Sequence, residues 1–466
     1  MAPDPLIARD LAVFWHPCTQ MRDHRALPPL EIKRAWGCRL ELGDGRVLLD
    51  AISSWWCKSL GHGHPRVRAA IERQLASFEH VIVAGFTFDP LVRLCERLLA
   101  LGNGAGPAGF GPHAPPGRPP GHFAHVFLAD NGSTAVEIAL KMALQAQAQR
   151  GQAGRTGFAA FANGYHGETV GALSVGDLGL YADPYRALTF DVTRLGPLPY
   201  RRGPGDPRWM DPDPEWQAMQ AQLAPIADQL AAIIYEPVLQ GAGGMRLYSP
   251  ALLGRLRRFA DAHGILLIAD EIAAGLGRTG ALLASHLAGP DLLPDFAVLS
   301  KGLTAGFLPL SAVLTTAEIY DLFDAEHAER KAFLHSNTYT GNALGVAAAL
   351  GALDAYAEED VLGAVARSAP LLQQQMAAVA AARPFVRDLR AAGMVAAFDL
   401  TRRDGQPLDA KLRTGYRVYA EALRRGALLR PLGDTMYLFP PLNTTDADLT
   451  SMVDILAASI DAVLAG

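Results

Sequence analysis

The sequence predicts an α/β protein that is built on a parallel or mixed sheet. Residues 265–268 and 296–299 are continuous apolar runs without polar alternation, which is typical of strands buried on both faces of a sheet. Residues 232–235 form a third apolar run, after an expected helix that ends near residue 229. The chain has 466 residues, of which 50% are hydrophobic, so it can bury a large core in about two or three domains.

Charged side chains follow two of these runs. Asp270 and Glu271 follow the first run, and the sequence Ser300-Lys301-Gly302 follows the second. In open α/β sheets, ligands bind outside the carboxyl ends of the strands. A lysine beside an acid at that edge suits a Schiff base to an aldehyde cofactor whose ring nitrogen is paired with the acid. From the residues alone, a structural ion pair between Asp270 and Lys301 is an equally good explanation.

Three motifs favour the cofactor site. ADEI at 269–272, GRTG at 277–280 and SKG at 300–302 together resemble the core signature of fold-type I, class III pyridoxal-phosphate aminotransferases. The resemblance extends over essentially the whole chain. It implies a large domain with a mixed, mainly parallel seven-stranded sheet, and a small α/β domain built from both chain ends. It also implies pyridoxal 5'-phosphate (PLP) as cofactor, with Asp270 on its pyridinium nitrogen and Lys301 bound to its aldehyde.

Composition favours a small-molecule partner. The net charge of −5 is small for this length, and no basic patch indicates nucleic acid or an anionic membrane. The start of the chain has no signal-peptide pattern and no apolar run of membrane-spanning length, so a cytoplasmic protein is expected. The cysteines are expected to be reduced, mostly buried thiols, without a disulfide framework or a metal site: Cys18, Cys38, Cys57 and Cys95.

The expected domains follow the order of the motifs. Residues 1–80 form the N-terminal part of the small domain, with short strands at 37–42 and 46–50 around a Gly-Asp-Gly turn. Residues 81–345 form the large PLP-binding domain. Residues 346–466 alternate long helical patterns with short strands, and they form the C-terminal part of the small domain.

Two segments are expected to be irregular. Residues 102–122 contain 13 glycines or prolines among 21 residues, so they are expected to form a surface loop without a regular element. They precede a strand expected at 125–129. Residues 195–216 are also rich in proline and are expected to be irregular.

Aromatic clusters near the start of the chain refine the resemblance. An isolated tryptophan is best explained as core. However, the HPxT pattern at 16–19, SSWW at 53–56 and GHGHP at 61–65 resemble one branch of class III, the 7,8-diaminopelargonate synthases of biotin biosynthesis. This resemblance implies that Trp55 and Trp56 help to line the substrate pocket.

The sequence DNGSTAVE at 130–137 is expected to turn from a strand into a helix that ends near residue 150, with Ser133 as the N-cap. A helix N-terminus also attracts anions, although a cap alone explains the pattern. The resemblance implies that Gly132 and Ser133 hold the cofactor phosphate. It further implies that Tyr165 stacks on the pyridine ring.

Two acidic residues keep open roles. Glu168 stands where the branch usually has Asp, which leaves its contact undecided. Glu236 follows the strand at 232–235, and it either orients its neighbours or forms a plain salt bridge.

Two later motifs complete the implied site. The resemblance places Ser336, Asn337 and Thr338 at a dimer interface, with Thr338 reaching the phosphate of the neighbouring subunit, so a homodimer with shared active sites is expected. Arg430 lies in an otherwise apolar stretch, and its planar guanidinium fits a carboxylate. The resemblance assigns the substrate carboxylate to Arg430, with Tyr437 nearby.

The branch implies transfer of an amino group from S-adenosylmethionine to 8-amino-7-oxononanoate (KAPA), giving 7,8-diaminononanoate in biotin biosynthesis. Lysine as the donor, or another class III omega-aminotransferase, are the alternatives. A non-catalytic cofactor-binding regulator would usually lack the lysine or carry an added DNA-binding domain. Cys18 leaves the donor open, because members that use S-adenosylmethionine typically have an aromatic residue there.

Overall fold

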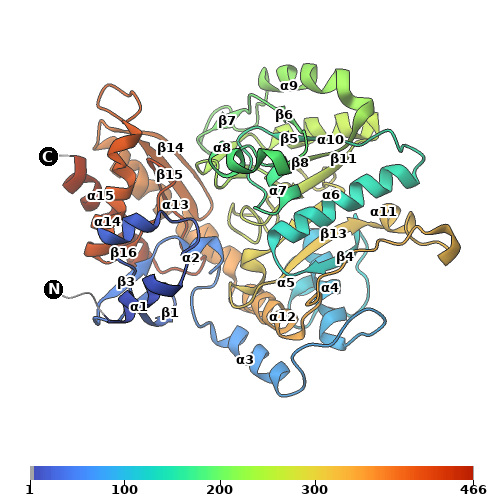
Figure 1. The fold of residues 1–466 in the computed structure, drawn as a ribbon, viewed down its shortest axis with the longest axis horizontal. Coiled ribbons are helices and arrows are strands. Elements are labelled where there is room, and N and C mark those ends of the chain that lie inside the picture. Colours follow the sequence, from blue (N-terminus) through green and yellow to red (C-terminus); the bar gives the residue numbers. More distant parts are fainter. Residues whose placement is uncertain (1–4, 465–466) are drawn as a thin grey trace.

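The computed structural model describes residues 5–464. Figure 1 shows the N-terminal segments (blue) and the C-terminal segments (red) together on one side of the molecule, and the middle of the chain on the other side. The two ends of the chain therefore build one lobe jointly. The expected boundaries at residues 80 and 345 stay a prediction. No helix among residues 5–464 is long and apolar enough to cross a membrane.

The middle of the chain contains the seven-stranded sheet that the resemblance implies. Its β13 runs antiparallel to both of its neighbours, and the other neighbouring strands are parallel. The predicted mixed, mainly parallel sheet is therefore confirmed. In spatial order its strands are β4 (Phe123–Ala129), β13 (Ser311–Thr316), β12 (Phe296–Leu299), β11 (Leu266–Asp270), β8 (Leu230–Tyr235), β5 (Gly157–Phe161) and β6 (Thr193–Leu195).

Helices cover both faces of this sheet. Every residue of β8, β11 and β12 is buried, as their continuous apolar runs predict. The helices of this part of the chain are α3 (Pro65–Leu75), α4 (Asp89–Gly102), α6 (Gly132–Gln149), α7 (Val170–Val175), α8 (Gly179–Ala182), α9 (Glu215–Leu223), α10 (Ala251–His263), α11 (Ala317–Asp321) and α12 (Ala343–Glu358). The side chains of α6 pack on one face, and those of α4 and α12 pack on the other face of the same central strands.

The other lobe joins the two chain ends through a sheet. β16, from near the C-terminus, pairs in parallel with β3. The order of this sheet is β1 (Ile32–Trp36), β2 (Arg39–Leu42), β3 (Val47–Asp50) and β16 (Ala427–Leu428). Around it lie α1 (Pro5–Val13), α13 (Val361–Ala381), α14 (Thr414–Arg425), α15 (Asp446–Leu464) and the sheet of β14 (Val386–Ala392), β15 (Val395–Leu400) and β17 (Thr435–Leu438). Sequence patterning did not predict β1, because four of its five residues are exposed.

Three local predictions are wrong. The N-cap of α6 is Asn131, whose side chain accepts the N–H of Thr134 at 3.1 Å, and Ser133 lies inside the first turn. The spacing of Val136, Leu140 and Leu144 predicts one buried apolar face on this helix, but Leu144 of α6 is exposed. The segment 102–122 contains a one-turn helix, α5 (Pro107–Phe110), and Phe110 is buried. Its apolar ring packs in the core, which composition alone does not reveal.

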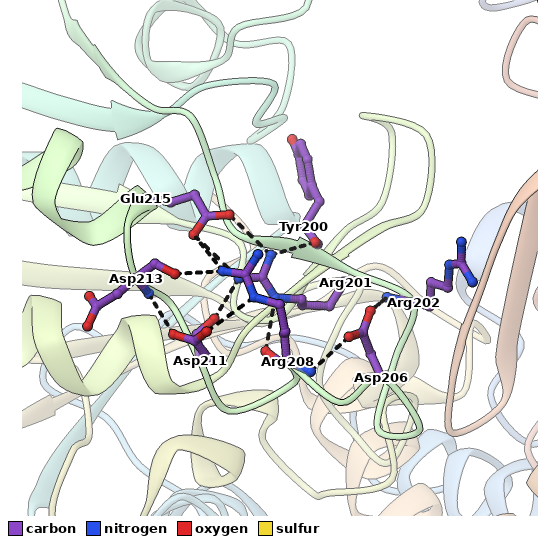
Figure 2. A network of polar contacts seen from close by, with 8 residues as sticks. All are labelled: Tyr200, Arg201, Arg202, Asp206, Arg208, Asp211, Asp213 and Glu215. Atoms are coloured by element: carbon purple, nitrogen blue, oxygen red, sulfur yellow. Dashed lines mark hydrogen bonds and ion pairs between the residues drawn. The ribbon is translucent and has the colours of Figure 1, made fainter.

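The proline-rich segment 195–216 is held by a buried arginine. It contains the short strand β7 (Tyr200–Arg201), which pairs with β10 (Arg246–Tyr248), the partner of β9 (Leu239–Gln240). The Arg201 guanidinium donates to the carbonyl oxygens of Arg208 at 2.9 Å and Asp211 at 2.6 Å, and to the Glu215 carboxylate at 3.2 Å (Figure 2). Between β7 and α9 the segment is irregular, as its proline content predicts, and the hydrogen bonds of this cluster hold it in place.

This cluster predicts a large stability difference between neighbouring arginines. Arg201→Met should lower the free energy of unfolding by about 3 kcal/mol, because it leaves the Glu215 carboxylate and the carbonyl oxygens without their buried donor. Arg202 is exposed and joins the cluster through its backbone N–H, which donates to Asp206 at 3.1 Å. Arg202→Met is therefore the matched control. Equal losses for the two variants in urea unfolding would contradict the role given to Arg201.

Candidate active site

A cavity of about 430 Å³ opens at the carboxyl ends of β11 and β12. Of the residues predicted for the site, it brings together Gly132, Ser133, Tyr165, Asp270, Lys301 and Trp56. Parallel strands end at the same edge of a sheet, and the segments that follow them form the cavity lining. The cavity therefore lies where the charged residues after the apolar runs predict a ligand site.

Lys301 lines this cavity without an ion-pair partner. Among residues 5–464, no carboxylate lies within ion-pair distance of its Nζ, so the structural ion pair with Asp270 is not formed. The Nζ lies 5.1 Å from the centre of a Trp56 ring. Burial lowers the pKa of Lys301, partly offset by the charges of Asp270 and Glu236. A lowered pKa increases the fraction of neutral, nucleophilic amine.

Asp270 is held by a histidine rather than by the lysine. Its Oδ2 lies 2.8 Å from Nδ1 of His166, and its Oδ1 accepts the N–H of Ile272 at 3.1 Å. Both Asp270 and His166 are buried. Nε2 of His166 has no partner among the described residues. His166 is not among the predicted site residues, although its position directly after Tyr165 in a glycine-rich motif was an available signal.

Two further buried carboxylates bind backbone rather than cations. Glu236 accepts the N–H of Tyr165 at 3.0 Å and the N–H of Gly241 at 2.9 Å. Glu271 accepts the N–H groups of Ala284 and Ser285. Burial raises the pKa of each acid to about 7. Of the two roles left open for Glu236, orientation of its neighbours is the one the contacts support, since it has no salt bridge within residues 5–464.

The N-terminus of α6 forms another side of the cavity. A Cβ at Gly132 would lie 2.8 Å from Cδ1 of Ile272, so a larger residue there would have to displace the end of the Ile272 side chain. A Cβ at Gly167, where φ is +128°, would lie 2.1 Å from Oγ of Ser133. The Ser133 hydroxyl accepts the N–H of Glu168 at 3.3 Å. These close approaches and the helix dipole fit an anion such as a phosphate.

The SSWW sequence forms a left-handed turn, α2 (Ser53–Trp56). Its four residues have φ values of +51°, +44°, +75° and +71°. Each left-handed residue other than glycine costs roughly 1–2 kcal/mol. Trp56 is buried and its Nε1 donates to the Tyr437 hydroxyl at 3.1 Å, while Trp55 is exposed beneath Arg430, whose Cζ lies 4.8 Å from the ring centre. Of the predicted tryptophan pair, Trp56 therefore lines the cavity, and Trp55 lies outside it, against Arg430.

The outer rim contains Cys18 and Glu168. The Tyr165 hydroxyl donates to Glu168 at 3.0 Å, and Sγ of Cys18 lies 3.9 Å from the same carboxylate oxygen. Burial, and then Glu168, raise the pKa of Tyr165 well above its ordinary value. Arg430 donates to the carbonyl oxygen of Cys18 at 2.8 Å and forms no ion pair with a carboxylate of residues 5–464. Its guanidinium is therefore available to a carboxylate from outside the chain.

Three predicted residues lie elsewhere. Ser336, Asn337 and Thr338 do not line the cavity of their own chain. The Thr338 carbonyl oxygen lies 2.9 Å from Nε2 of His80. The cysteine prediction is also wrong in part, because only Cys38 is fully buried, while Cys18 is exposed.

The family model described as aminotransferase class-III matches residues 19–460. The chain belongs to the class III aminotransferases. As a member of this family, the enzyme uses PLP, and the unpaired Lys301, the fixed Asp270 and the glycine-lined helix N-terminus fit that cofactor. The family predicted from the ADEI, GRTG and SKG motifs is therefore confirmed.

Several related proteins match nearly the whole length of this chain. Adenosylmethionine-8-amino-7-oxononanoate aminotransferase from Synechococcus elongatus is 40% identical over 97% of this chain and 99% of that protein. The enzyme of the same name from Nitratidesulfovibrio vulgaris is 39% identical, over 97% and 81%.

Solved structures of related aminotransferases also match this chain over nearly its whole length. The Methanocaldococcus jannaschii enzyme of that name has a TM-score of 0.88 at 31% identity and covers 98% of this chain and 99% of its own. A PLP-bound amine transaminase from an uncultivated Pseudomonas species has a TM-score of 0.85 at 34% identity, over 97% and 99%.

Proposed function

We propose that this class III aminotransferase transfers an amino group from S-adenosylmethionine to KAPA and forms 7,8-diaminononanoate for biotin synthesis. The names and coverage of its relatives support this acceptor and donor. The observation that carries the chemistry is the unpaired Lys301 beside an Asp270 that His166 holds. A cytoplasmic location stays a prediction.

Lys301 and Asp270 divide the catalytic work. Bound PLP supplies an aldehyde that takes up the amino group and a protonated ring that accepts electrons. Lys301 would hold this aldehyde, and its neutral Nζ would carry the proton from the substrate's α-carbon. The Asp270 carboxylate, which His166 holds in place, would keep the proton on the ring nitrogen. Tyr165 would cover the ring face, and Gly132 and Ser133 would bind the phosphate.

Residues around the cavity entrance recognise the substrate. Arg430 binds a substrate carboxylate, because its guanidinium has no anionic partner within the described chain and is oriented by Trp55 and the Cys18 carbonyl. Trp56 and Tyr437 form the apolar wall beside Lys301. One structural neighbour is an amine transaminase, so the alternative is an enzyme that accepts a broader range of carbonyl compounds as amino acceptors. Comparing activity on KAPA with activity on simple ketones tests this alternative.

The first functional prediction concerns Lys301. Lys301→Ala should lower turnover by at least about 10³-fold, because both the covalent attachment and the proton carrier are lost. The variant should retain PLP through noncovalent contacts, measured as bound absorbance after gel filtration. Lys33 is exposed on β1, so Lys33→Ala is the matched control and should keep full turnover. Near wild-type turnover of Lys301→Ala would refute the assignment.

A homodimer with shared sites is the second part of the proposal. Ser336, Asn337 and Thr338 lie away from their own cavity, and exposed apolar residues surround this region: Val81, Ile82, Phe86, Leu334 and Tyr339. A second copy of the chain would cover these side chains and bring Thr338 to the phosphate of its partner.

Mixed dimers test this sharing. Lys301→Ala and Thr338→Ala should each be impaired alone, and subunit exchange between them should restore activity. One site of each mixed dimer then combines Lys301 from one subunit with Thr338 from the other. Mixing two preparations of Lys301→Ala is the control. No gain after confirmed exchange would show that Thr338 acts within its own subunit or not at all.

The donor is predicted to be S-adenosylmethionine. Cys18 contributes its carbonyl oxygen to Arg430, so a change of its side chain keeps that contact. Cys18→Tyr should lower the apparent KM for S-adenosylmethionine about two- to tenfold through one added hydrogen bond, and lysine should stay unused. Cys95→Ser, away from the cavity, is the control. Single-turnover assays that show amination of the cofactor by lysine and none by S-adenosylmethionine would overturn this donor.

A further inference from the structure

We propose that Asp50 is a positioning residue of the substrate pocket. Its carboxylate locks the left-handed turn α2, and this turn places Trp56 beside Lys301 and Trp55 beneath Arg430. The pocket's identity rests on the proposed function, whereas the lock rests on the contacts of Asp50. Asp50 is the last residue of β3, is fully buried and does not itself line the cavity.

Both oxygens of Asp50 are occupied by the turn. Oδ1 accepts the N–H of Ser54 at 2.9 Å and the N–H of Ile52 at 3.3 Å. Oδ2 accepts the Ser54 hydroxyl at 2.6 Å and lies 2.9 Å from Nε2 of His62. Buried carboxylates that accept several hydrogen bonds hold their partners strongly. Asp50 therefore acts on the turn from inside the protein.

The turn needs such a lock. L-residues other than glycine visit the left-handed region as single residues, and here four adopt it in succession. The hydroxyl of Ser53 donates to the Phe439 carbonyl oxygen at 2.7 Å and anchors the start of the turn to the chain's C-terminal part. Without the Asp50 contacts, right-handed conformations become accessible, and these point both indoles elsewhere.

The turn acts on the site by positioning the indole rings of Trp55 and Trp56. A Cβ at Gly241 would lie 3.2 Å from the Trp56 ring, so Trp56 already fits closely against the wall that Glu236 supports. The ring centre lies 5.1 Å from Nζ of Lys301. A change in the turn therefore alters the surroundings of the reacting amine and of Arg430 together.

The geometry of Asp50, Ser54 and His62 is not that of a Ser-His-Asp proton relay. Asp50 and Ser54 both contact Nε2 of His62, at 2.9 Å and 3.3 Å. A Ser-His-Asp relay requires the acid and the hydroxyl on opposite ring nitrogens. The three side chains thus form a structural lock and no proton relay.

Substitutions at Ser54 separate the lock from ordinary stability. Ser54→Ala and Ser54→Gly lose the same hydroxyl, but only glycine adopts positive φ freely. Ser54→Ala should raise the KM for the acceptor about threefold or more, with kcat changed less, and Ser54→Gly should stay near wild type. Asp50→Asn should raise KM on the order of tenfold, and Asp50→Asn with Ser54→Gly should recover most of the loss.

The near-UV circular dichroism of the cofactor-free protein provides a second readout. Its tryptophan bands should change in Asp50→Asn and return in the double variant. Asp295 accepts bonds from Arg257 and the N–H of Leu267 in the large sheet, so Asp295→Asn is a control that lowers stability without moving KM or these bands. Equal KM values for the alanine and glycine variants, or an unchanged spectrum in Asp50→Asn, would overturn the lock. A wild-type enzyme inactive on KAPA would overturn the proposed function only.

Discussion

The site depends on the separation of two opposite charges. Asp270 ends β11 and Lys301 follows the neighbouring strand β12, yet the carboxylate is bound by His166 and the amine forms no ion pair within residues 5–464. An ion pair between them would stabilise the ammonium form and raise the pKa of the lysine. Because burial prevails instead, the pKa is lowered, which a nucleophilic amine requires. His166 is the residue that makes this division possible.

The second constraint is the contact between the lobes. Arg278 is buried, and no carboxylate of the described part of the chain pairs with it. Its guanidinium donates to the carbonyl oxygens of Met394 and Pro440, and its Cζ lies 3.7 Å from the centre of the Phe439 ring. Burial lowers its pKa to about 9. Arg390 likewise donates to Met245 at 3.0 Å. Both arginines fix the C-terminal strands against segments from the middle of the chain, so Tyr437 keeps its contact with Trp56, whose ring lies beside Lys301.

Sequence patterns predicted the features that depend on a short stretch of neighbouring residues. The run at 296–299 matches β12, because a strand buried on both faces needs apolar side chains throughout. Asp270 and Lys301 could be placed at the carboxyl edge of the sheet because they stand where these apolar runs end. Contacts between distant segments left no such pattern: His166 reaches Asp270 across 104 residues, and the left-handed turn depends on Asp50 and on Phe439. The Asn131 cap was missed because Ser133 is an equally good capping residue by type.

Borohydride reduction of the PLP-loaded enzyme, followed by peptide mass spectrometry, tests the central claim most directly. Reduction fixes the cofactor to the lysine that holds its aldehyde, and the chain offers six lysines. Lys58 is the informative competitor, because it is also partly buried and has a lowered pKa, but its Nζ is bound to the Gly306 carbonyl oxygen at 2.7 Å. The account predicts one modified peptide, containing Lys301. Modification at Lys58, or at several lysines equally, would contradict it.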